Sequence, residues 1–65
     1  MIIKAIGNLA KEENVLIELK IGPDGAMSIL VYGNGSRDLT IVCWEWSEET
    51  IMDAIRDTIR RVKGR

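Results

Sequence analysis

The sequence predicts an α+β domain: a three- or four-stranded antiparallel meander followed by one C-terminal helix packed on one face of the sheet. Two turn sequences, at residues 22–25 and 33–36, separate segments in which apolar residues alternate, as they do in β-hairpins. From Ser47 onward the apolar residues recur with a helical period instead. The chain has 65 residues, which is enough for a single domain.

The first element is an apolar segment at residues 2–6 that ends at Gly7. We expect a short strand there, paired with the strand at residues 14–21 or lying on a partner chain. The polar segment between them suits a loop, or a single helical turn capped by Asn8.

The first hairpin is predicted by the turn sequence Gly22-Pro23-Asp24-Gly25. Proline presets φ for the first central position of a type I turn, and Gly25 can adopt the positive φ of the bulge that follows. Strands at about residues 14–21 and 26–33 should therefore pair, with Ile21 opposite Met27.

A second hairpin is predicted at Asn34-Gly35, which tolerates the positive φ values of a two-residue type I′ loop. This loop leads into the last strand of the sheet, at about residues 37–45, with Ile29 opposite Thr40. The two turns together give one face of the sheet a nearly continuous apolar surface, because opposite residues share a face. That face contains Val15, Ile17, Leu19, Ile21, Met27, Ile29, Val31, Val42 and Trp44.

The other face is polar on its first strand and apolar towards its last strand. An antiparallel sheet with one wet face normally alternates cleanly between apolar and polar residues. Here an apolar patch is expected on the second face as well. It consists of Leu16, Leu30, Tyr32, Leu39, Ile41 and Cys43.

The C-terminal helix is predicted at about residues 47–62. Ser47 is a suitable N-cap, Glu48 and Glu49 complement the helix dipole, and Gly64 suits the C-terminal end. The apolar residues that follow the period are Ile51, Ala54, Ile55, Ile59 and Val62. One helix covers only one face of a sheet, so the second patch is expected to contact another chain, most simply in a twofold homodimer. The alternative is that the N-terminal segment folds over the patch.

Composition argues for binding rather than catalysis. The chain has no histidine and a single cysteine, Cys43, so no disulfide, metal site or cofactor is expected. Cys43 is interpreted as a small buried hydrophobe, and the carboxylates around Glu45 as partners of a helix start. Trp44 is assigned to the core, and Trp46 to a hydrophobic staple on the helix.

The unpaired thiol and the lack of a recognisable signal segment favour a reducing, cytoplasmic setting, and no membrane span is expected.

Charge is nearly balanced overall but not along the chain. Residues 1–55 carry a net charge of -5 and residues 56–65 a net charge of +4. The basic end is interpreted first as a complement to the dipole of its own helix, and second as a contact for phosphates.

Three functional hypotheses follow. The first is a small, non-catalytic, homodimeric or homo-oligomeric protein that binds and modulates, or inhibits, another macromolecule, most simply a protein. The second is a single-stranded nucleic-acid-binding domain, by analogy with dimeric ββββα modules. The third is a site for a nucleotide-sized ligand at the oligomer interface. The residues considered for ligand or nucleic-acid contact are Tyr32, Arg37, Glu45, Arg60, Arg61, Lys63 and Arg65.

Overall fold

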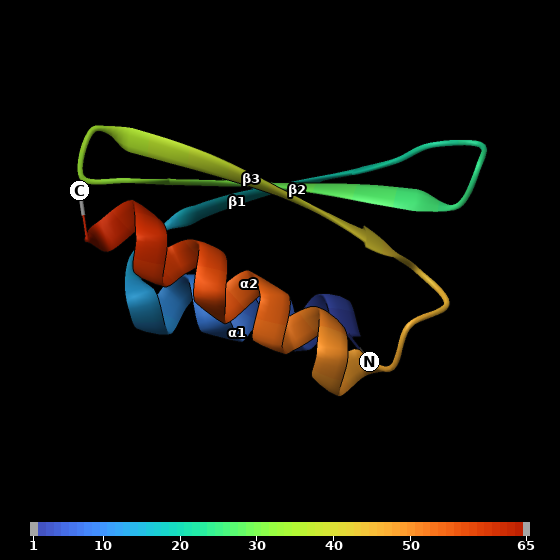
Figure 1. Ribbon diagram of the computed structural model, residues 1–65. Coiled ribbons are helices and arrows are strands. Elements are labelled where there is room, and N and C mark those ends of the chain that lie inside the picture. The colour runs from blue at the N-terminus through green and yellow to red at the C-terminus, as the bar shows by residue number, and fades with distance from the viewer. Residues whose placement is uncertain (1, 65) are drawn as a thin grey trace.

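The computed structural model describes residues 2–64 as one antiparallel sheet with two helices on the same side of it (Figure 1). The sheet order is β1-β2-β3, a simple meander. In chain order the elements are α1 (Ile2–Glu13), β1 (Leu16–Ile21), β2 (Ala26–Gly33), β3 (Ser36–Cys43) and α2 (Glu48–Lys63). The α+β class is confirmed, with three strands and two helices.

The prediction of a strand at residues 2–6 is wrong, because these residues form the first half of α1. Ile2, Ala5, Ile6 and Leu9 recur at helical spacing and all pack in the core or against it. Burial of Ile6 and Leu9 against α2 and β1 favours a helix over the strand that the isoleucine-rich start suggested.

Two residues account for the difference. Gly7 does not end an element but lies within the helix, where a Cβ would have no atom within 4 Å. Asn14 does not begin a strand but has φ 56°, the left-handed conformation that often ends a helix. The amide of Val15 then donates to the carbonyl of Ala10 at 3.1 Å and closes the helix end.

The first hairpin has the predicted turn. Gly25 has φ 84°, and its amide donates to the carbonyl of Gly22 at 3.1 Å. The amide of Ala26 donates to Oδ1 of Asp24 at 3.0 Å, as expected for an aspartate in a turn. Ile21 lies opposite Met27, so the predicted register of β1 and β2 is confirmed.

The second hairpin also matches its prediction. Asn34 and Gly35 have φ values of 52° and 72°, both positive as a type I′ loop requires. Ile29 lies opposite Thr40. The third strand occupies residues 36–43 rather than 37–45, and the first begins at residue 16 rather than 14.

The helix α2 begins as predicted. The side chain of Ser47 accepts a hydrogen bond from the amide of Thr50 at 3.2 Å. Glu48 and Glu49 stand in the first turn and Arg60, Arg61 and Lys63 in the last, which complements the helix dipole at both ends.

The core lies between the sheet and the two helices. Ile29 and Val31 of β2 and Ile55 and Val62 of α2 have no exposed surface. The buried Thr58 is satisfied by donating to the carbonyl of Ala54 at 2.9 Å. Arg61 of α2 reaches β3, where its Nε donates to Oδ2 of Asp38 at 2.8 Å. Ile6 and Leu9 of α1 belong to the same core, so both helices pack on one face of the sheet and the other face remains open (Figure 1).

Candidate interaction surface

The open face of the sheet is the side that carries no helix, and its predicted apolar residues are much exposed. The side chains of Leu16, Leu39 and Ile41 are 62%, 46% and 59% exposed. Leu30, Tyr32 and Cys43 are partly buried by their neighbours. Exposed apolar residues scattered singly are ordinary, whereas a contiguous group indicates an interface.

The strand register shows that the group is contiguous. Leu30 lies opposite Leu39, Leu16 opposite Tyr32, and Ala26 opposite Cys43. Residues opposite each other on one face are about 4.5–5.5 Å apart at Cβ. Leu30, on the central strand, therefore joins the exposed side chains of the two outer strands.

The N-terminal segment does not cover this surface. Its residues 2–13 form α1, which contacts α2 and β1 from the helix side of the sheet (Figure 1). Within residues 2–64, no element lies over the open face. The alternative of a patch covered by its own chain is thus not seen in the part that the structure describes.

Tyr32 is held in place on the open face by Glu18. Its hydroxyl donates to Oε1 of Glu18 at 2.6 Å. This hydrogen bond raises the pKa of the Tyr32 phenol above its usual value, with desolvation and the Glu18 charge adding to the effect and Arg37 opposing it.

The structure separates the residues of the nucleotide hypothesis. Tyr32 and Arg37 are register partners beside the β2–β3 turn, where they border a shallow hollow. Glu45 follows β3 at its opposite end. Eight strand residues span about 26 Å, so within one chain Glu45 does not share a small ligand with the other two. A site of all three residues would need Glu45 from a second copy.

The basic end of α2 is largely committed to ion pairs. Arg61 binds Asp38 and Asp57, and Nζ of Lys63 lies 3.3 Å from Oε1 of Glu13 on α1. The contact with Asp38 raises the pKa of Arg61. Nη1 of Arg60 lies 3.8 Å from Oδ1 of Asp57, and the Arg60 side chain is mostly exposed. Arg65, also considered for phosphate contact, lies outside the described residues.

The core assignment of Trp44 is wrong, because its side chain is 59% exposed. Alternation placed it beside Val42, but the last paired residue of β3 is Cys43, opposite Ala26. Its ring lies over the first turn instead: a Cβ on Gly25 would be 2.8 Å from Nε1 of Trp44. Ile21, at the same end of the sheet, is exposed as well.

Trp46 is 48% exposed and lines a groove that the sequence did not predict. The groove has a volume of about 280 Å³. Its other lining residues are Asp24, Ala26, Ile41, Val42 and Cys43. It lies at the end of the sheet where the first turn meets the connection to α2. The signal in the sequence was the presence of two tryptophans just beyond the end of a strand.

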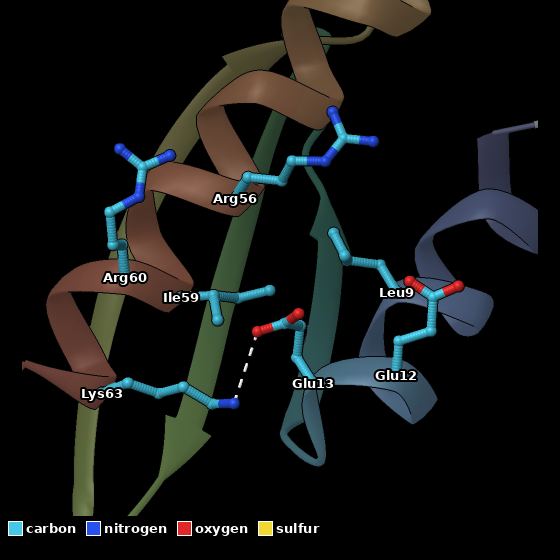
Figure 2. A pocket seen from close by; sticks show the side chains of 7 residues that line it. All are labelled: Leu9, Glu12, Glu13, Arg56, Ile59, Arg60 and Lys63. Atoms are coloured by element: carbon cyan, nitrogen blue, oxygen red, sulfur yellow. Dashed lines mark hydrogen bonds and ion pairs between the residues drawn. The ribbon is translucent and has the colours of Figure 1, made fainter.

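A second hollow, of about 340 Å³, lies between α1 and α2 (Figure 2). Leu9 and Ile59 line it between the helices, and the Glu13–Lys63 pair bridges the two helices at its edge. Arg56 and Arg60 also line it, but each pairs with an aspartate of α2. These charges connect helical segments and present no converging set of free groups.

Residues 2–64 contain no group of three or more histidine, cysteine, aspartate or glutamate side chains placed to hold a metal ion. Neither α1 nor α2 has the length and apolar character needed to cross a membrane.

Comparisons with known proteins find no matching family model, no similar curated protein and no similar solved structure. The chemistry of the open face is therefore the basis for assigning a function.

Proposed function

We propose that this protein is a small, non-catalytic interaction protein that self-associates through the open face of its sheet and binds and modulates another macromolecule. The observation that carries the proposal is the exposure of Leu16, Leu39 and Ile41 on a face that no described element covers. The single thiol, Cys43, suits a reducing, cytoplasmic setting.

Burial of these side chains provides the driving force. Full burial of one leucine or isoleucine side chain stabilises by about 1.5–3 kcal/mol. Self-association buries the same set on both chains, so each chain contributes equally. A domain of this size gains little stability from its own core, and association is a common way to add to it.

The area of the face indicates how tight the contact is. Three strands about 4.8 Å apart, of six, eight and eight residues at roughly 3.3 Å per residue, form a face of roughly 20–26 by 14 Å. If both faces are treated as flat, their contact buries on the order of 800 Å² in total. Stable complexes bury roughly 1,200–2,000 Å². We therefore expect an assembly that dissociates on dilution.

The charges of the open face favour a second copy as the occupant. Glu18 and Lys20 on β1 and Arg37 on β3 give the face both signs of charge. Such a mixture does not repel its own copy, whereas a strongly basic face would favour a polyanion. A single-stranded nucleic acid is less well supported, because Arg61 and Lys63 are engaged in ion pairs away from this face.

Light scattering coupled to size exclusion, run across a dilution series, tests the proposal. The wild type should form a dimer that dissociates on dilution. Ile41→Glu should be monomeric and folded, because a charge in the contact opposes burial. Ile3→Glu is the matched control, since Ile3 is equally exposed but lies on α1, away from the open face.

A wild type that is monomeric at every concentration would contradict the proposal. So would an Ile41→Glu variant that unfolds by circular dichroism without first dissociating, because Ile41 would then be a residue of the core.

A further inference from the structure

The groove beside Trp46 combines an aromatic wall, aliphatic side chains and a carboxylate. Ile41, on the open-face side, is 59% exposed, and Asp24 supplies the carboxylate at the turn. One oxygen of Asp24 accepts a hydrogen bond from the amide of Ala26 at 3.0 Å, which holds the carboxylate in place. The backbone of Trp46 is also fixed in place, because the amide of Trp46 donates to the carbonyl of Cys43 at 3.0 Å.

The segment of the chain that carries Trp46 is acidic. Residues 38–55 contain no lysine or arginine. Glu45, Glu48 and Glu49 lie within three residues of Trp46, and within residues 2–64 they form no ion pair or side-chain hydrogen bond. Lys20 is level with Ile41 in the register but two strands away, on β1.

We propose that this groove binds a basic segment of a partner protein, with one lysine or arginine side chain lying along Trp46 and Ile41. The aliphatic stem of such a side chain packs on apolar surface while its charged end stays near carboxylates. A cation over the face of a tryptophan is attracted by the ring. A volume of about 280 Å³ accommodates one such side chain.

Charge selects the occupant. The carboxylate of Asp24 in the groove, with the glutamates that flank Trp46 in the chain, would repel a phosphate backbone or an anionic membrane surface and attract a cationic segment. The inference deepens the proposed function by naming the chemistry of the macromolecular partner. The groove shares Ile41 and Cys43 with the open face, so self-association and partner binding compete for this end of the sheet, whereas Leu16, Leu30 and Leu39 do not line the groove.

The test is the fluorescence anisotropy of a short labelled peptide of alternating arginine and glycine, titrated with the full-length protein. A peptide with glutamate in place of arginine is the charge control. The arginine peptide should bind saturably and more weakly at high salt, because salt screens exposed charges. The glutamate peptide should not bind.

Two variants locate the contact. Trp46→Ala should weaken binding roughly tenfold, as expected from the loss of a cation–aromatic contact. Trp44→Ala is the matched control: Trp44 is of the same type and similarly exposed, but it does not line the groove. The triple change of Glu45, Glu48 and Glu49 to glutamine should weaken binding and flatten its salt dependence. Glu12→Gln, on α1, should do neither.

Leu39→Glu separates this inference from the proposed self-association. The variant should be monomeric and should still bind the arginine peptide. Loss of peptide binding in folded Leu39→Glu would assign the contact to the self-associated face and overturn the proposal. Equal affinity of Trp46→Ala and wild type, or binding of the glutamate peptide, would overturn it as well.

A second copy would be the occupant if Trp46→Ala dissociated the assembly while Leu39→Glu did not. The basic end of a neighbouring α2 would then fill the groove, and the assignment to a separate partner protein would be wrong.

Discussion

The hydroxyl of Tyr32 donates a hydrogen bond of 2.6 Å to Oε1 of Glu18, across the pairing of β1 and β2 on the open face. The two residues are diagonal neighbours, because Leu16 stands opposite Tyr32 and Leu30 opposite Glu18. The only tyrosine of the chain, on the central strand, is thereby linked to an outer strand of the proposed interface.

The phenol of Tyr32 should titrate above its ordinary pKa of 10.0, because its proton is held by Glu18. The raised pKa means that the folded state binds this proton more tightly than the unfolded state. The resulting stabilisation is complete below the pKa of the unfolded phenol and is lost as pH rises through the folded value. Ultraviolet absorbance of the phenolate measures this directly, since no second tyrosine interferes.

The control for that titration is Glu18→Gln, which removes the carboxylate charge. The pKa of Tyr32 should fall towards its ordinary value in this variant. If wild type and variant titrate together, the hydrogen bond to Glu18 is not present in solution.

Replacing Gly25 by alanine should cost more stability than the same change at Gly35. Both glycines have positive φ, for which a side chain costs on the order of 1–2 kcal/mol. A Cβ at Gly25 also meets Nε1 of Trp44 at 2.8 Å, whereas a Cβ at Gly35 meets nothing within 4 Å. Urea unfolding of the two variants measures the difference.

The background Trp44→Ala isolates the contribution of the ring. The difference between the two alanine variants should shrink there, because the obstacle at Gly25 is gone. Equal losses at Gly25 and Gly35 with Trp44 present would show that the ring does not rest on the turn.

Gly7→Ala should raise the free energy of unfolding by about 0.5–1 kcal/mol, because glycine is a poor residue inside a helix and the site is open. Gly7→Val should gain less, since β-branched residues are less favourable in helices. Thermal unfolding followed by circular dichroism ranks the three proteins. A higher unfolding temperature for Gly7→Val than for Gly7→Ala would instead indicate a strand in this segment.

The hairpins and α2 were predictable because their signals are local. Gly25, Asn34 and Gly35 have the positive φ values that their turns need, and each turn sets the register of the strands beside it. Ser47 caps α2 within its first turn. In each case the residues that decide the structure lie within a few positions of each other.

The tryptophan end was not predictable by alternation. The period-two pattern of β3 continues through Trp44, whose amide still donates to the carbonyl of Gly25 at 3.2 Å, and the chain then turns. Alternation assigns residues to faces only as long as a neighbouring strand is present. Ile21, paired with Met27 on the same face, is exposed as well, so the exposure of Trp44 reflects how far the helices extend over the sheet. The residue pattern alone does not give that extent.

By itself the sequence determined the register of the meander, the apolar character of both sheet faces and the start of α2, since turn geometry and capping act over a few residues. Only the tertiary structure decided that residues 2–13 form a helix and that this helix lies on the same side of the sheet as α2. The physical reason is burial: Ile6 and Leu9 lose contact with water only once α2 and β1 are in place beside them. Because both helices lie on that side, Leu39 and Ile41 on the other face remain uncovered.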